Sequence, residues 1–532
     1  MSVLRSKIDT TDEVYRANRA AQLAAVDALD EQMALARVGG GEKYAQRHRA
    51  RGRLPVRERI ELLVDRDSPL LELSTLAAWG TEFTVGASIV TCIGVVSGVE
   101  CVLIAHDPTV RGGAMNPYTL RKTLRALEIA RLNRLPVINL VESGGADLPN
   151  QSELFVFAGK IFHDLTELSS MGITTVALVF GNSTAGGAYV PGMCDYAVLV
   201  DRSAKVFLGG PPLVKMATGE DANDEELGGA DMHARVSGVA DYFALDERDC
   251  IRIGREIVEQ LRWRKLGPPP SELPDEPNYD PDELLGIVSA DFRVPFDPRE
   301  VLARVVDGSR FTEYKSRYGT SLVTGWASVH GYPIGVLANE RGVLFSEEAK
   351  KASEFILLAN QGDIPLVFLQ NTTGYMVGTQ YEKGGIIKDG AKMINAVANS
   401  TVPHITVNMA ASFGAGNYGM SGRAYDPRFM FAWANAKLAV MGAQQLAGVM
   451  SIVGRQSAAA AGRPFDVATD DERRQRIEAQ IERESHAFFI TARLYDDGVI
   501  DPRDTRSVLG MTLSAAHSAT VAGRRGFGVF RM

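Results

Sequence analysis

The chain repeats two short motifs at one fixed spacing, and this repetition limits the folds that it can adopt. Residues 135–145 (LPVINLVESGG) and 364–374 (IPLVFLQNTTG) each hold a proline, an apolar run and a polar turn ending in glycine. Residues 183–189 (STAGGAY) and 412–418 (SFGAGNY) are separated by the same offset as the first pair. Because a shared offset across two motifs is hard to produce by chance, we infer an internal duplication.

The pattern around the motifs indicates the fold class. In each half the second motif follows another apolar run, at residues 174–180 and 404–410, and a helical pattern separates the two motifs. Short buried strands that alternate with helices are typical of α/β folds. The sequence therefore predicts an α/β protein made of two duplicated, βα-rich domains.

A proline-rich segment divides the chain nearly in half. Residues 267–281 contain six prolines with acidic residues between them, a composition that cannot sustain a helix or a central strand. We therefore expect an N-terminal domain at 1–270 and a C-terminal domain at 282–532. Residues 12–37 carry apolar residues at helical spacing and stop at a run of glycines, which predicts a helical packing arm within the N-terminal domain.

Charge and composition exclude several classes of function. The net charge of −8 provides no global field to attract nucleic acid. The four cysteines form no C-x-x-C pair, and no run of 18 apolar residues occurs, so we expect a cytoplasmic protein without a membrane segment. Arginines gather between Arg47 and Arg59, which is compatible with a solvated helix face or with a role in holding an anionic ligand.

The small residues of the second motif have the composition of an oxyanion hole. Two consecutive backbone N–H groups can hold one anion, and glycine or alanine leaves room for close approach. We expect such holes at Gly186 and Gly187 and, in the other half, at Ala415 and Gly416, which implies two anions. The alternative is tight packing of a strand against a helix, and the duplication argues against it.

Other chemistries lack their signatures. Residues 414–419 fit G-x-G-x-x-G, but no acidic residue follows about 20 positions later and the duplicate at 185–190 fails the pattern, so we reject NAD binding. The sequence has no phosphate-binding loop, no G-x-S-x-G and no H-E-x-x-H. It therefore predicts chemistry without a side-chain nucleophile and without a protein-bound metal.

At these motifs the sequence resembles the carboxyltransferase (β) subunits of biotin-dependent acyl-CoA carboxylases over nearly its whole length. The PPLVKMATGE and GAGNYGM forms are similar to the methylcrotonyl-CoA branch of that family. The residues that carry the resemblance include 50–60, 141–151, 181–193, 207–220, 227–238, 342–352, 371–393, 412–429 and 495–506.

The resemblance implies two crotonase-like spiral domains, of which the N-terminal one binds acyl-CoA and the C-terminal one binds carboxybiotin. The substrate is a branched or unsaturated acyl-CoA such as 3-methylcrotonyl-CoA. Sites form between the N-terminal domain of one subunit and the C-terminal domain of another, which implies a homo-oligomer, a hexamer in the family. The chain has no A-M-K-M biotin acceptor, so biotin and its ATP-dependent carboxylation come from a partner α subunit.

The resemblance also assigns residues to each site. Besides the four hole residues, it implies that two further sets contact the ligands, and two positions, Phe413 and Asp147, depart from the usual family residues. The acyl-CoA set is Ser143, Gly144, Gly145, Ala146, Ala185 and Tyr189; the biotin set is Thr373, Gly374, Tyr375, Phe413, Gly414 and Tyr418.

Three other functions fit the same fold. An acyl-CoA decarboxylase subunit would run the reverse transfer, and a neighbouring gene for a membrane decarboxylase pump would indicate it. A crotonase-type hydratase or isomerase would need a carboxylate beside the glycine motifs, where the sequence has none. A non-catalytic structural β paralogue would tolerate replacement of either glycine motif without loss of activity in its complex.

Overall fold

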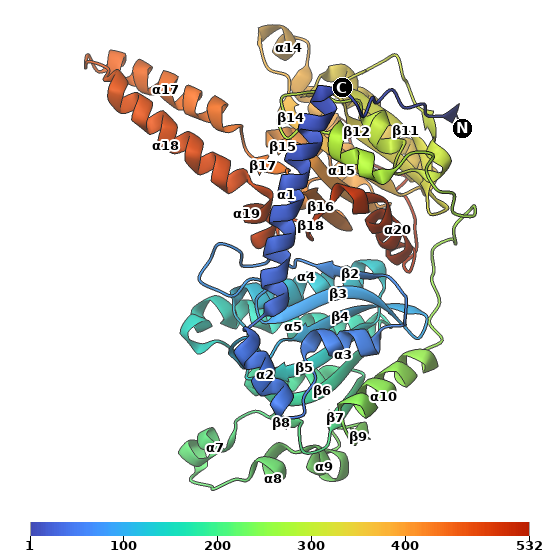
Figure 1. Cartoon of the computed structure of the whole chain (residues 1–532), viewed down its shortest axis with the longest axis vertical. Coiled ribbons are helices and arrows are strands. Elements are labelled where there is room, and N and C mark those ends of the chain that lie inside the picture. Colours follow the sequence, from blue (N-terminus) through green and yellow to red (C-terminus); the bar gives the residue numbers. More distant parts are fainter. Residues whose placement is uncertain (1, 531–532) are drawn as a thin grey trace.

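The computed structural model describes residues 2–530, which form two β-sheets, each with helices packed around it (Figure 1). The first sheet has the order β2-β3-β4-β5-β6-β7-β9, and β8 pairs with β6. Its strands are β2 (Leu70–Leu73), β3 (Ile89–Val96), β4 (Val99–His106), β5 (Val137–Ser143), β6 (Thr175–Thr184), β7 (Tyr196–Val200), β8 (Lys205–Phe207) and β9 (Tyr242–Ala244).

The second sheet repeats this order as β10-β11-β12-β14-β15-β16-β18, with β1 added at its edge, β13 beside β14 and β17 beside β15. Its strands are β1 (Ser2–Val3), β10 (Arg310–Glu313), β11 (Leu322–Val329), β12 (Tyr332–Asn339), β13 (Gly342–Leu344), β14 (Leu366–Tyr375), β15 (His404–Phe413), β16 (Phe429–Trp433), β17 (Lys437–Ala439) and β18 (Val499–Ile500).

Helices follow the strands in both halves, and a hairpin of α17 and α18 projects from the second half (Figure 1). The helices of the first half are α2 (Glu42–Ala50), α3 (Val56–Leu63), α4 (Pro117–Asn133), α5 (Gln151–Ser170), α6 (Tyr189–Met193), α7 (Pro211–Thr218), α8 (Asp224–Gly228), α9 (Ala230–Met232) and α10 (Glu247–Gln260). Those of the second half are α11 (Leu284–Ile287), α12 (Pro298–Leu302), α13 (Ser346–Gln361), α14 (Thr379–Lys383), α15 (Ile386–Asn399), α16 (Gly414–Gly419), α17 (Ala443–Ala460), α18 (Val467–Ser485), α19 (Ala487–Ala492) and α20 (Thr505–Ala516).

The duplication predicted from the sequence is confirmed in the strand register. Strands β5 and β6 are parallel and pair Ser143 with Ser183, while β14 and β15 pair Thr372 with Ser412. Thr372 follows Ser143, and Ser412 follows Ser183, by the same number of residues that separates the repeated motifs. Parallel neighbours are buried on both faces, which is why these strands are continuous apolar runs in the sequence.

A buried lysine repeats at the same offset. Lys122 donates from Nζ to the carbonyls of Gly86 and Ile89 at 3.2 and 2.7 Å. Lys351, its counterpart in the second half, donates to the carbonyls of Gly319 and Leu322 at 3.3 and 2.7 Å. In both halves a lysine on the helix before the first motif therefore holds the loop that leads into the antiparallel hairpin.

The N-terminal arm is a helix, as predicted, and it packs on both halves: the Trp79 indole of the first half donates to the Gln32 side chain at 2.9 Å. Helix α1 spans Glu13–Val38, begins at the Asp12 cap and ends at Gly39, whose φ is 56°. The Gln22 amide donates to the Val288 carbonyl at 3.0 Å, and β1 pairs with β10. The limits 1–270 and 282–532 remain a prediction, and residues 2–38 contact the second half across them.

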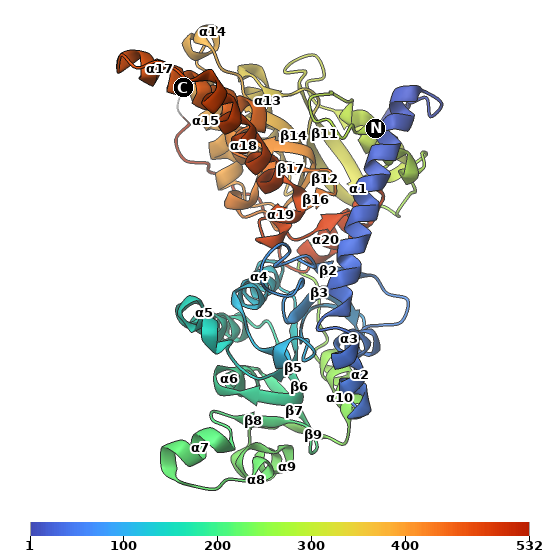
Figure 2. The same cartoon turned by 60° about the vertical axis from the view of Figure 1, so that its left-hand side comes forward.

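The two halves are joined by a buried ion pair. Arg125 on α4 donates from Nε and Nη2 to both carboxylate oxygens of Asp497 at 2.7 and 2.9 Å. Helix α4 accordingly lies at the junction, next to α19 and α20 of the second half (Figure 2). Among residues 2–530, no helix is both long and apolar enough to cross a membrane.

Candidate functional site

The first candidate site lies where β5 and β6 end side by side. The turn after β5 carries Gly145 with a φ of 94°, and a Cβ at that position would lie 3.1 Å from the Thr184 carbonyl oxygen. Only glycine therefore lets the turn approach the end of β6 so closely. The structure brings the two predicted N-terminal motifs, 143–146 and 185–189, into contact.

Hydrogen bonds fix the shape of this turn. The Ser143 hydroxyl donates to the Gly113 carbonyl at 2.7 Å and accepts from the Gly145 N–H at 3.2 Å. The Gly144 N–H donates to the Gly112 carbonyl at 3.0 Å, and Gly144 and Ala146 are exposed. Ser143 itself is buried, so its hydroxyl shapes the turn and is not offered to solvent.

The predicted hole opens a short helix directly after β6. Residues Ala185–Ala188 form one turn of 3₁₀-helix that continues into α6. The first N–H groups of a helix have no partner within it, and here they belong to Gly186 and Gly187, of which Gly186 is exposed. A Cβ on Gly186 would come no closer than 3.5 Å to Phe162, so the space beside this helix start is open, as an oxyanion site requires.

The second candidate site has the same geometry at the equivalent positions. Gly374, with a φ of 126°, donates its N–H to the Thr372 hydroxyl at 3.3 Å, as Gly145 does to Ser143. Gly414 has a φ of 54°, and its counterpart Ala185 has a φ of 55°. Both helices therefore begin with one residue in the left-handed conformation, which turns the chain sharply out of the strand.

The second site is more tightly packed than the first. A Cβ on Gly416 would lie 2.5 Å from the Thr372 hydroxyl oxygen and 2.9 Å from the Gly374 Cα. The nearest atom to a Cβ on Gly187, in contrast, is the Ser183 hydroxyl at 3.8 Å. Ala415 is exposed, so the start of α16 also faces a solvent-accessible edge.

Of the residues predicted to contact biotin, Phe413 is buried and Tyr375 is partly buried. The Phe413 ring is buried and packs edge-to-face on Phe292 at a centroid distance of 5.2 Å. The Tyr375 side chain lies against Gly390 and Gly419, between α15 and α16, and its hydroxyl has no hydrogen-bond partner among the described residues. Burial raises the pKa of Tyr375 well above its usual value.

The other predicted aromatic contacts are accessible. Tyr189 is 43% exposed beside Phe162, and Tyr418 is 44% exposed beside Tyr425. Thr373 is exposed and donates its hydroxyl to the Gly342 carbonyl at 3.1 Å. The ligand contacts assigned to these residues remain predictions, and the structure shows that their two sets form two separate clusters.

Asp147, one of the two positions that depart from the usual family residues, forms an ion pair. Asp147 accepts from Arg111 at 3.0 Å and from the Asn150 amide at 2.9 Å, and it is buried. The carboxylate therefore ties the turn at 143–150 to the loop before α4. The sequence offered no indication of this partner, because 36 residues separate Arg111 from Asp147.

The sequence analysis missed a buried charge network behind the first turn. Glu142, the residue before Ser143, pairs with Arg53 and with Arg59, whose Nη1 lies 2.7 Å from Oε2. Arg59 also binds Glu247 at 2.7 Å and is 1% exposed. Part of the arginine-rich segment is thus neither a solvated face nor a ligand site, because it neutralises two buried carboxylates.

Glu142 is charged because its partners outweigh its burial. Burial raises the pKa of Glu142, but the charges of Arg59, Arg53 and His48 lower it further, and the net pKa lies below the usual value. Such a group stabilises the fold above the carboxylate's ordinary pKa, and this contribution is lost as the pH falls through the lowered value.

Replacing Glu142 by glutamine is expected to lower the free energy of unfolding by about 3 kcal/mol at about pH 7, because Arg59 keeps a buried charge with one partner fewer. The difference from the parent should shrink as the pH falls through the lowered pKa of Glu142, because the parent carboxylate is then protonated as well. Urea unfolding of parent and variant at about pH 7 and at acid pH measures this difference in the free energy of unfolding. Glu58→Gln is the control: Glu58 pairs with Arg49 at 2.7 Å on the surface, where removal of the pair should change the free energy of unfolding far less. Equal losses for both variants would contradict the role of the network.

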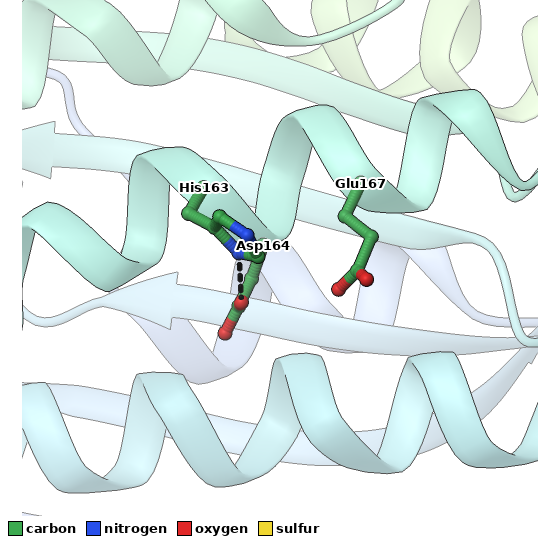
Figure 3. A group of neighbouring side chains, drawn as sticks. All are labelled: His163, Asp164 and Glu167. Carbon is green, nitrogen blue, oxygen red and sulfur yellow. Dashed lines mark hydrogen bonds and ion pairs between the residues drawn. The ribbon is translucent and has the colours of Figure 1, made fainter.

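One group of side chains within residues 2–530 has the composition of a metal site. His163, Asp164 and Glu167 lie together on α5 (Figure 3). The Lys160 ammonium, however, already binds both oxygens of Asp164 at 2.6 and 2.8 Å, and the His163 ring lies 3.0 Å from the same carboxylate. The group is therefore an ion-paired stretch of helix surface, and we assign no metal to it.

Comparison with known proteins gives one consistent family. Residues 47–529 match the carboxyl transferase domain model. A probable biotin-dependent acyl-coenzyme A carboxylase β2 subunit of Mycobacterium tuberculosis is 62% identical over 530 residues, which cover 100% of both chains. The biotin-dependent 3-methylcrotonyl-coenzyme A carboxylase β1 subunit of the same organism is 49% identical over 95% of this chain and 96% of its own.

A solved structure agrees with these relatives. The β subunit of geranyl-CoA carboxylase from P. aeruginosa superposes with a TM-score of 0.90 and 41% identity, covering 100% of this chain and 99% of the other. The resemblance inferred from the glycine motifs is thereby confirmed, as is the crotonase-like fold. Since the family model and these relatives span nearly the whole sequence, the chain belongs to the carboxyl transferase family and is an enzyme of the acyl-CoA carboxylase β-subunit type.

Proposed function

We propose that the chain transfers CO2 from carboxybiotin, carried by a partner α subunit, to a branched or unsaturated acyl-CoA such as 3-methylcrotonyl-CoA. The observation that carries the proposal is the duplicated pair of helix starts at residues 185–188 and 414–417, each placed against a glycine turn of its own sheet. Two equivalent sites for oxyanions suit a transfer between two ligands that both develop negative charge on oxygen.

The C-terminal site fits the biotin ring system by its donor set. The N–H groups of Ala415 and Gly416, at the start of α16, suit a ureido oxygen, and Thr372 and Gly374 leave no room for a side chain on Gly416. When bound, carboxybiotin supplies the CO2 and a ureido nitrogen that accepts a proton from the acyl-CoA. The two N–H groups stabilise the ureido oxygen as charge collects there.

The N-terminal site holds the other oxyanion. The N–H groups of Gly186 and Gly187 bind the thioester oxygen and stabilise the enolate that attacks CO2, each hole contributing on the order of 3–4 kcal/mol. The hydroxyls of Ser143 and Ser183, which belong to the two motifs, already donate to the carbonyls of Gly113 and Gly187. These serines are therefore not free to act as bases, in line with proton removal by the biotin nitrogen.

Exposed apolar side chains support self-association through both sites. On α5, directly after the first turn, Phe155, Val156 and Phe157 are 83, 76 and 62% exposed. Helix α17, which follows the loop packed on Gly414, exposes Val449, Met450, Ile452 and Val453. Contiguous apolar patches of this kind mark protein interfaces, and these two lie on the helices that lead away from the two sites. A homo-oligomer that pairs the N-terminal half of one subunit with the C-terminal half of another would cover them.

Reconstitution tests the proposal. The chain is combined with a biotinylated α subunit, ATP and bicarbonate, and carboxylation of acetyl-, propionyl-, 3-methylcrotonyl- and geranyl-CoA is compared. We expect the highest kcat/KM for a branched unsaturated substrate. Faster turnover of acetyl-CoA or propionyl-CoA would contradict the substrate class, and absence of any carboxylation by an assembled complex would contradict the proposed reaction.

The purified chain alone is expected neither to hydrolyse ATP nor to carboxylate any acyl-CoA, because its sequence has no phosphate-binding loop and no biotin acceptor motif. Phosphate release and incorporation of labelled bicarbonate measure the two activities, and addition of the α subunit is the positive control. ATP-dependent carboxylation by the isolated chain would disprove the need for a partner.

A further inference from the structure

A cavity of about 650 Å³ lies between the two halves of the chain. Helices α4 and α5 form its N-terminal wall, and the segments around residues 423 and 493–495 form its C-terminal wall, at the junction seen in Figure 2. Its lining includes six cationic side chains and two carboxylates: Arg121, Arg125, Arg131, Lys160, Arg423 and Arg493, with Glu128 and Asp164.

Half of these cations are neutralised by acidic residues. Arg125 binds Asp497, which is completely buried, at 2.7 Å, and Arg423 lies 3.4 Å from the same carboxylate. Lys160 binds Asp164 at 2.6 Å. The carboxylates at this junction are thus already engaged with Arg125, Arg423 and Lys160.

The other three cations have no acidic partner in the part of the chain that the structure describes. The Arg121 guanidinium lies over the Tyr118 ring at 5.5 Å, and that of Arg493 lies over Phe489 at 3.3 Å and donates to the Phe489 carbonyl. Arg131 pairs with no carboxylate in residues 2–530. The positive charge at this junction therefore exceeds the negative charge.

A further, partly buried cation next to Arg131 adds to this excess. Arg428 donates to the Asn133 side chain at 3.3 Å and to a backbone carbonyl, without a carboxylate partner among the described residues. Burial, followed by the charge of Arg131, lowers the pKa of Arg428 to about 10. Like charges held close together raise the free energy of the fold unless an anion compensates them.

We propose that this interdomain cavity binds a small polyanion that carries a diphosphate group. A volume of this size suits a small ligand, and guanidinium groups bind phosphate oxygens through paired hydrogen bonds. Three unneutralised arginines match the two to three charges of a diphosphate. Arg121 and Arg131 come from the first half and Arg493 from the second, so the ligand would bridge the halves beside the Arg125–Asp497 pair.

Calorimetry of the full-length chain with inorganic pyrophosphate tests the proposal. The triple variant Arg121→Gln, Arg131→Gln, Arg493→Gln should bind pyrophosphate at least about tenfold more weakly, the loss expected from removing even one charged hydrogen bond. The control replaces three exposed arginines outside the cavity, Arg37→Gln, Arg317→Gln and Arg476→Gln, with the same change of net charge. Equal affinity of both triple variants, or no binding by the parent chain at low salt, would overturn the proposal.

Two further measurements identify the source of the diphosphate and separate this site from the proposed function. If the triple variant loses pyrophosphate binding, competition by coenzyme A shows whether the bound group belongs to that ligand or to a free diphosphate. Without pyrophosphate, the triple variant should retain the parental kcat in the reconstituted assay. Its KM for acyl-CoA should stay parental if the ligand is a free diphosphate and should rise if coenzyme A supplies the group. If it instead fails to assemble with the α subunit while the parent binds no pyrophosphate, the cavity takes an acidic protein segment and the proposal is wrong.

Discussion

Valine in place of Gly187 is expected to lower carboxylation of 3-methylcrotonyl-CoA by a factor of about 10²–10³ and to leave decarboxylation of free carboxybiotin unchanged. Gly187 does not have a positive φ, and a Cβ there would meet only the Ser183 hydroxyl at 3.8 Å. The added methyl groups therefore fit the fold and crowd the N–H groups that hold the enolate. Carbon–carbon bond formation needs both sites, whereas CO2 release needs only the C-terminal one.

Both activities are measured on the same reconstituted complex. Gly192→Val is the matched control, because Gly192 is exposed on the following helix and a Cβ there would meet no atom within 4 Å. We expect the control to retain both activities. If folded Gly187→Val lost carboxybiotin decarboxylation together with acyl-CoA carboxylation, the assignment of one ligand to each half would be wrong.

Alanine in place of Gly416 is expected to lower both activities by a factor of about 10² or more. The new methyl group would lie 2.5 Å from the Thr372 hydroxyl oxygen and 2.9 Å from the Gly374 Cα, so the helix start must move away from its turn. Overpacking of this kind costs about 1–3 kcal/mol and displaces the N–H groups that hold the ureido oxygen. Even the smallest side chain should therefore abolish the C-terminal site.

Two further variants test whether the loss of activity comes from the helix start at Gly416. Gly448→Ala on α17 adds the same methyl group where no atom lies within 4 Å, and it should leave the melting temperature and both activities unchanged. If Gly416→Ala does not fold, Ala415→Val is used to test the same proposed hole, because its added methyl groups lie on an exposed residue. A folded Gly416→Ala enzyme that still decarboxylates carboxybiotin would show that biotin binds elsewhere.

The sequence was informative where local pattern and function coincide. The apolar runs before the glycine motifs predicted β5, β6, β14 and β15, and the helical spacing after residue 12 predicted α1. Parallel strands buried on both faces and an amphipathic helix each impose a pattern that a single segment carries in full. The glycine motifs also predicted where a turn and a strand end approach each other closely, because such an approach of two backbones excludes larger side chains.

Contacts between segments far apart in the chain could not be predicted, because they produce no pattern in the sequence of either segment. Nothing near Glu142 indicated that Arg59, far earlier in the chain, would neutralise it. Nor did the sequence show that Phe413 would be buried against Phe292, so its contact with biotin remains a prediction. The arm at residues 13–38 was expected within the first domain, and the structure shows that it contacts both halves. A helix specifies which of its faces is apolar and does not specify which surface covers that face.

The sequence by itself thus determined the duplicated α/β architecture and the family, and it located the glycines at which two oxyanion holes are proposed, because each depends on residues close together in the chain. Only the tertiary structure decided which charges are buried and paired, which aromatic residues reach the surface, and where arginines from both halves gather without acidic partners among the described residues. Those properties depend on distances between residues far apart in sequence, and such distances are set by how the two sheets and their helices pack together.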